Sequence, residues 1–243
     1  MITGSMTGRE LFEIFKKDKP KLEKFASDKA RRLLRELRKG MKEYTTQCYD
    51  FKTKEQTEYK VCVFVNRSNI RKYYFDMYIY CKESNDYVCV SVLTDEENNM
   101  EQFSYTPHFL HRYAERALGD GNMPINRVLA HIEREVAYTV LIYKDETSKV
   151  IATSMGLYLQ KIDRKRGFNI CKTFISIDML KASQIKAYIV VADLIQKYSE
   201  RYTKVQRLDN VRLDFAKDCL VRGITEKDLI DAYGEYFINK TKK

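Results

Sequence analysis

Apolar residues recur at every second position in three consecutive runs of the chain, and this alternation constrains the fold more than any other feature. The runs cover residues 59–66, 71–82 and 87–93 and are rich in Val, Tyr and Phe. Successive side chains of a strand point to opposite faces, so an alternating run is typical of a half-buried strand. Polar, turn-forming segments separate the runs, which predicts an antiparallel meander.

Elsewhere the apolar spacing changes to that of helices. Two helices are predicted after a polar loop at 95–101, each with Pro in its first turn and with glycines between them. Near the start, Thr7 is expected to cap a short helix through Lys17, Pro20 to interrupt it, and Ser27 to cap a second helix through Lys39. The downstream predictions are helices at 107–118 and 124–135, strands at 138–143, 150–154, 157–162 and 168–177, and further helices at 183–198 and 225–238.

These elements predict an α+β fold with antiparallel sheet or sheets, a helix pair, a basic N-terminal helical arm and C-terminal helices. The expected division is an arm at 1–43, a body at 44–182, and a helical cover at 183–243 packed on the body. The chain has three Pro and nine Gly in 243 residues, and no Pro/Gly/Ser-rich linker marks a second domain.

The net charge of +10 lies at the two ends of the chain. Residues 1–42 hold 13 basic and 6 acidic side chains, the last four residues add three lysines, and residues 43–239 hold 28 of each sign. Attraction of a polyanion is therefore expected from the ends.

Several protein classes are excluded or disfavoured. The longest apolar run, about 187–192, is far below the ~18 residues of a membrane span, so no membrane partner is expected. No secretory signal is visible, and Gly4-Ser5-Met6 is consistent with a cloning remnant before a native start at Met6. Six cysteines without a CxxC pair favour a reduced protein, cytoplasmic or carried within a phage particle.

Two basic clusters are candidates for phosphate binding. One lies opposite the leucines of the helix at 27–39 and the other at the turn 163–167 of a predicted hairpin. A solvated helix face, a membrane-surface helix and a solubilising hairpin tip are the alternatives. The candidate nucleic-acid-binding residues are Lys29, Arg31, Arg32, Arg35, Arg38 and Lys39, with Arg164, Lys165 and Arg166 at the tip.

The predicted helix at 107–118 contains the strongest candidates for catalytic side chains. At 100° per residue its five functional polar side chains share an arc of about 140°, opposite the apolar ones. Histidines exchange protons near neutral pH and arginines bind phosphate oxygens, so this face suits cleavage of a phosphodiester without metal. A single-helix metal site and a solvated face without a role are the alternatives. The five residues are His108, His111, Arg112, Glu115 and Arg116.

This helix, the helix after it and the strands ending in Lys172-Thr-Phe-Ile175 resemble the RelE/ParE-like toxin superfamily. The resemblance covers about residues 104–180 and is carried by His-x3-Arg-x3-Arg, which is His108, Arg112 and Arg116 here. It implies a core of two helices and a sheet and, as in RelE-like members, metal-independent cleavage of mRNA, with Lys172 added to the catalytic candidates. The chain departs from these toxins in its greater length, and ParE-like members show that the fold does not by itself imply ribonuclease activity.

The sequence therefore predicts a nucleic-acid-binding protein, with RNA favoured over DNA. As an enzyme it would be a metal-independent endoribonuclease of toxin-like type without a cofactor. The alternative is a non-enzymatic phage or bacterial structural or interaction protein that docks through its basic N-terminal arm, for which an acidic protein is a suitable partner. The sequence contains no GxGxxG, GxxxxGK[ST], GxSxG or HExxH motif.

Overall fold

The computed structural model describes residues 2, 5–40, 42, 44–67, 73–81, 88–94, 100–135, 137–142, 147–153, 155–180 and 221. The chain forms two compact units. The first contains Met1–Glu135 and Ile162–Thr173, and the second contains Val136–Lys161 and Phe174–Lys243. The helices predicted at 183–198 and 225–238 lie outside the described residues.

The first unit is built on a meander that continues the predicted one in both directions. Neighbouring strands pair antiparallel from β1 to β5, and β9 then pairs parallel to β5, so the order is β1-β2-β3-β4-β5-β9. The predicted three strands are β2, β3 and β4, while β1 and β5 are additions. The bounds are β1 (Tyr44–Lys52), β2 (Glu58–Asn66), β3 (Tyr73–Tyr80), β4 (Cys89–Thr94), β5 (Met100–Tyr105) and β9 (Phe168–Ser176).

Strand β5 corrects the expectation of a polar loop at 95–101, because the last two of those residues already belong to the strand. Its six residues include Glu101, Gln102 and Ser104, which give a weak strand signal. The strand forms because both of its edges are paired, with β4 along its full length and with β9 at Phe103–Tyr105.

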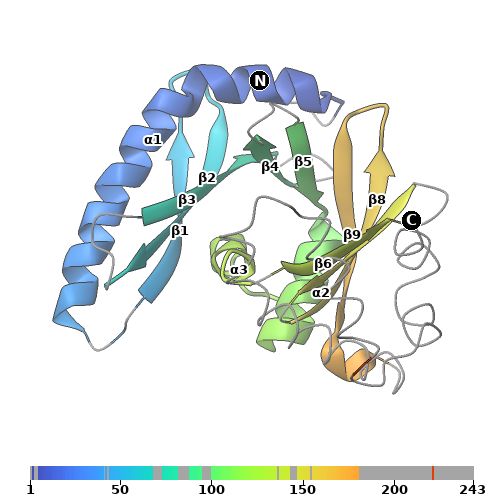
Figure 1. Cartoon of the computed structure of the whole chain (residues 1–243). Helices are drawn as coiled ribbons and strands as arrows, with labels where there is room; N and C mark the ends of the chain where they lie inside the picture. Colours follow the sequence, from blue (N-terminus) through green and yellow to red (C-terminus); the bar gives the residue numbers. More distant parts are fainter. Residues whose placement is uncertain are drawn as a thin grey trace. The chain divides into compact units, whose positions relative to one another are not determined.

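One helix, α1 (Gly8–Lys39), covers one face of this sheet (Figure 1). The prediction of two helices separated at Pro20 is wrong, since Pro20 lies inside a continuous helix whose axis changes direction along its length. An interior proline costs about 3 kcal/mol, and each fully buried Leu or Phe recovers about 1.5–3 kcal/mol. The buried stripe runs unbroken past the proline at helical spacing and outweighs its cost: Leu11, Phe15, Asp18, Leu22, Ala26, Ala30, Leu33 and Leu37.

The predicted helix pair is confirmed as α2 (Pro107–Leu118) and α3 (Ile125–Ile132). The side chains of Tyr49 and Phe51 on β1 pack with α1, so the alternating Thr46 and Asp50 face the other side of the sheet. There α3 contacts β1 and β2, and Asn126 donates to the Asp50 carboxylate at 3.2 Å. The sheet of the first unit therefore lies between α1 and α3.

The start of α1 is fixed by a glycine. The Gly8 N–H donates to the Arg166 carbonyl at 2.7 Å, and its own carbonyl accepts from Gln102 Nε2 at 2.6 Å. A Cβ at this position would lie 2.1 Å from Gln102 Oε1 and 2.9 Å from the Gly167 carbonyl oxygen. Only glycine allows this close approach of α1 to β5 and to the β8–β9 turn.

The described part of the second unit contains the strands β6 (Ala137–Ile142), β7 (Ser148–Thr153) and most of β8 (Gly156–Asp163). They pair antiparallel in the order β6-β7-β8. A short 3-10 turn, η1 (Ile177–Met179), follows β9. The strands agree with those predicted at 138–143, 150–154 and 157–162, and the α+β class is confirmed.

Across the described residues, no helix combines the length and the apolar character that crossing a membrane requires. The longest, α1, is charged along its outer face. Five of the cysteines are free thiols in the described part of the chain: Cys48, Cys62, Cys81, Cys89 and Cys171.

Asp18, the polar member of the buried stripe, accepts a hydrogen bond whose contribution to stability can be measured. The Tyr59 hydroxyl donates to Asp18 Oδ2 at 2.9 Å, with Lys21 Nζ 3.2 Å from Oδ1. Tyr59→Phe leaves that oxygen buried without its donor, so we expect the free energy of unfolding to fall by about 1–3 kcal/mol. Urea unfolding followed by circular dichroism measures it, with Tyr44→Phe at an exposed site as the control. Equal losses in the two variants would contradict the assignment.

Candidate functional site

The start of α2 is anchored to β9 by its N-cap. The Thr106 hydroxyl accepts from the Phe109 N–H at 3.0 Å and donates to the Cys171 carbonyl at 3.0 Å. The Lys172 carbonyl oxygen lies 3.4 Å from the same hydroxyl. The structure therefore places the backbone of Lys172 beside the residue that begins α2, two positions before His108.

The polar face of α2 lies as predicted. His108, His111 and Glu115 are exposed, and Arg112 and Arg116 are partly exposed. Four of the apolar side chains opposite them are buried: Phe109, Leu110, Tyr113 and Ala114. The His111 Nδ1 donates to the Gly121 carbonyl at 3.0 Å, which places the proton of the neutral ring on Nδ1 and leaves Nε2 as the acceptor. A Cβ at Gly121 would lie 2.8 Å from the His111 ring, so glycine is needed there.

Arg112 of this face is paired with an acidic side chain of the same helix. Arg112 Nη1 lies 2.7 Å from Glu115 Oε2, and the hydrogen bond from Arg112 holds the pKa of the Glu115 carboxyl below its ordinary value. Glu115 is therefore ionised at neutral pH and offsets part of the positive charge that would bind a phosphate. Lys172 is exposed, and its side chain makes no hydrogen bond or ion pair with any described residue.

The three basic residues at the tip of the β8–β9 hairpin differ in exposure: one is partly buried and two are exposed. Arg166 Nε donates to Asp163 Oδ2 at 2.9 Å and its guanidinium lies 6.0 Å from the centre of the Phe168 ring, so this residue is partly buried and held in place. Arg164 and Lys165 are exposed. These two side chains lie at the surface of the tip, beside the start of α1.

The six candidate basic residues of α1 also differ in exposure. Lys29 lies against the rings of Phe25 and Tyr49, with its Nζ 5.0 Å and 4.8 Å from their centres. The other five candidates are exposed because the apolar stripe of the helix is turned to the sheet: Arg31, Arg32, Arg35, Arg38 and Lys39.

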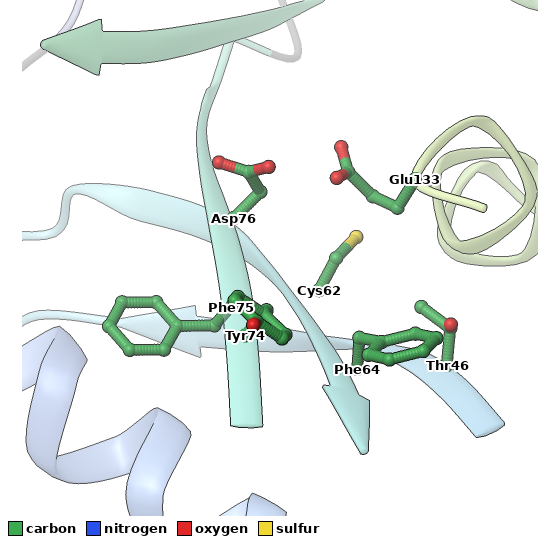
Figure 2. Close-up of a pocket in the computed structure, with 7 residues that line it drawn as sticks. All are labelled: Thr46, Cys62, Phe64, Tyr74, Phe75, Asp76 and Glu133. Atoms are coloured by element: carbon green, nitrogen blue, oxygen red, sulfur yellow. The ribbon is translucent and has the colours of Figure 1, made fainter. Parts of the chain in front are cut away.

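On the face of the sheet opposite α1, the first unit contains a pocket of about 270 Å³ (Figure 2). Its polar residues come from four elements: Thr46 from β1, Cys62 from β2, Asp76 from β3, and Glu133 from the turn after α3. Figure 2 shows the Asp76 and Glu133 carboxyl groups on one side of the pocket. The aromatic side chains of Phe64 and Tyr74 line it, and Phe75 also borders it, although its ring points away.

Strand register assembles this pocket. Cys48 pairs with Cys62 across β1 and β2, and Cys62 pairs with Asp76 across β2 and β3, so the three side chains form one row on one face. The chain reverses twice between them, which is why sequence reasoning missed the site. The available signal was Asp76 itself, the only charged residue in the apolar, aromatic strand β3.

The Asp76 and Glu133 carboxyl groups lie close enough together to affect each other's ionisation. Burial, then the nearby Asp76 carboxyl, raises the pKa of Glu133 well above its ordinary value, and burial raises the pKa of Asp76. The pair therefore retains a proton at a pH where an exposed carboxyl would have lost it. Within the described residues, no group of three or more His, Cys, Asp and Glu side chains is arranged to hold a metal ion.

No family model matches the chain, and neither a curated protein nor a solved structure matches it. The resemblance of residues 104–180 to RelE/ParE-like toxins therefore stays a prediction.

The carboxyl pair makes stability depend on pH. The folded-state pKa of Glu133 is above its unfolded value of about 4.3, so stability is greatest below that value and falls as the pH rises toward the folded pKa. Glu133→Gln keeps the shape and cannot ionise. We expect the free energy of unfolding of this variant, relative to the wild type, to increase from pH 4.5 to pH 7.5. Urea titrations at four pH values measure this, with Glu13→Gln on the exposed face of α1 as the control. A difference independent of pH would contradict the shared proton.

Proposed function

We propose that the chain binds single-stranded nucleic acid, RNA in preference to DNA, along the outer face of the C-terminal half of α1. The observation that carries the proposal is the orientation of this helix. Its leucines pack on the sheet, so Lys24, Arg31, Arg35 and Arg38 form an exposed stripe. At 1.5 Å per residue, cations spaced seven residues apart lie about 10 Å from each other along the axis.

The charge balance of this half favours a polyanion. Residues 29–39 contain six basic side chains and one acidic side chain, Glu36. Arg35 Nε donates to the Arg31 carbonyl at 3.3 Å, which holds its guanidinium along the helix while its other N–H groups remain available. A guanidinium with free donors suits the two oxygens of a phosphate.

Exposed aromatic rings lie on the face of the sheet away from α1, beside the strand end that is tied to the end of α1, and they favour a single strand over a duplex. Tyr44 is 53% exposed and Tyr74 is 65% exposed, and both lie against Phe64, with ring centres 6.0 Å and 6.3 Å from it. The Arg67 side chain donates to the Gly40 carbonyl at 3.2 Å, which ties the end of β2 to the end of α1. Unpaired bases stack on such rings while cations hold the backbone.

The salt dependence of binding tests this proposal. Each phosphate contact that is lost lowers the slope of log K against log salt by about 0.7–0.9. We expect Arg31→Ala/Arg35→Ala/Arg38→Ala to reduce the slope by about 2–3 for a fluorescent 20-nucleotide RNA. The control removes three cations elsewhere, in Lys54→Ala/Arg127→Ala/Lys161→Ala, and should leave the slope unchanged. An unchanged slope in the α1 variant would show that this helix does not contact the RNA. Binding of an acidic protein but not of RNA would support the alternative of a structural or interaction protein.

Ribonuclease activity is the second candidate function. It is supported by the exposure of His108 and His111 on one face of α2. Proton transfer by a histidine contributes about 10²–10⁴-fold to such a reaction. We expect His108→Ala/Arg112→Ala to lower the rate of cleavage of a labelled RNA in EDTA by at least about 10²-fold, while RNA affinity at the α1 face is retained. The matched control is Arg127→Ala on α3. Equal cleavage by the wild type and the double variant would end the ribonuclease hypothesis and leave the binding proposal standing.

A further inference from the structure

The pocket opposite α1 contains two carboxyl groups without a basic partner among the described residues. Asp76 and Glu133 come from different elements and meet at this pocket, and no described Lys, Arg or His side chain forms an ion pair with either of them. The guanidinium of Arg134, the residue after Glu133, donates to the Thr46 carbonyl at 2.9 Å. Apposed carboxyl groups in a partly enclosed site are stabilised by a proton or by a cation.

A second observation in the same pocket points to a ligand. The Thr46 side chain lines it and is only 3% exposed, yet its hydroxyl oxygen has no hydrogen-bond partner among the described residues. Leaving a buried hydroxyl unpaired costs about 1–3 kcal/mol. A hydrogen-bonding ligand in the pocket would satisfy this group.

The remaining walls are aromatic. Phe64 and Tyr74 line the pocket with ring centres 6.3 Å apart, while the ring of Phe75 points away from it toward the α1 side. Aromatic faces attract cations, and a planar guanidinium both stacks on a ring and donates hydrogen bonds in its own plane. A volume of about 270 Å³ admits such a group with a short alkyl chain.

We propose that this pocket binds a guanidinium group, which donates to the Asp76 and Glu133 carboxylates and to the Thr46 hydroxyl and stacks against Phe64 or Tyr74. The proposal does not depend on nucleic-acid binding. A free alkylguanidine and the arginine side chain of a peptide share this chemistry, and the experiment distinguishes these two sources.

Binding of the cation displaces the proton that the carboxyl pair retains. Affinity should therefore rise with pH as the pair ionises. The other titratable or charged groups around the pair include the Cys62 and Cys48 thiols and the Tyr74 and Tyr105 hydroxyls on the sheet. From the α3 side they include His131 and Arg134, which flank Glu133 in the chain. Burial and the Cys48 thiol raise the pKa of Cys62, and burial lowers the pKa of His131, so both stay neutral near pH 7.

The test is isothermal titration calorimetry on the full chain with n-butylguanidinium and with its neutral planar isostere n-butylurea. We expect one site for the cation, at least tenfold weaker binding of the urea, and affinity that increases from pH 5.5 to pH 8. Repeating the titration in two buffers of different ionisation enthalpy should show net release of protons. Equal binding of the two probes, or binding of neither, would overturn the proposal without any variant being made.

Variants then locate the site. Glu133→Gln should weaken butylguanidinium binding at least tenfold and abolish proton release, and Thr46→Val, which keeps the side-chain shape, should weaken it severalfold. Glu13→Gln is the control, and circular dichroism checks each fold. Wild-type affinity in a folded Thr46→Val and a folded Glu133→Gln would place the cation elsewhere and overturn the assignment. Titration with acetyl-Gly-Arg-Gly-amide against its citrulline counterpart shows whether a peptide is the source; if only the free alkylguanidine binds, the ligand is a small molecule.

Discussion

The packing of one apolar helix stripe on β1–β3 is the constraint on which the rest of the first unit depends. It continues past Pro20 because the free energy of burying leucines along the whole helix exceeds the cost of one missing hydrogen bond. The same packing decides what faces solvent, since a helix that buries one stripe exposes the opposite one. It also occupies one face of the sheet, which leaves Cys62, Asp76 and Thr46 on the other.

Sequence reasoning succeeds where a local signal and the tertiary structure agree. The bounds of α2 follow from Thr106, Pro107 and Gly119, and its polar face follows from angles within a single helix. The prediction fails at Pro20, where the cost of one proline competes with the packing of a whole helix of 32 residues, about nine turns. Sequence reasoning also misses β1, because Thr45, Thr46 and Gln47 weaken its alternation of apolar and polar residues. The strand forms because it pairs with β2 along its whole length.

The two candidate sites differ in how far they can be foreseen. The face with His108 and Arg112 belongs to one element, so the sequence suffices to place its residues side by side, although not to show that Glu115 pairs with Arg112. The pocket with Asp76 and Glu133 requires two strand registers and the docking of α3. No spacing along the chain indicates that these carboxyl groups share a proton, because the intervening 56 residues fold into other elements.

The first unit is assembled from two separate stretches of chain, and this affects the order in which it is completed during synthesis. The carbonyl that receives the Gly8 N–H belongs to Arg166, which is made 158 residues later. The second edge of β5 likewise stays unpaired until β9 is made, which follows β6, β7 and β8 in the chain. Non-local pairing of this kind slows folding, and domains otherwise tend to form as they emerge. The amino end of α1 is therefore anchored only after the β8–β9 turn has been made.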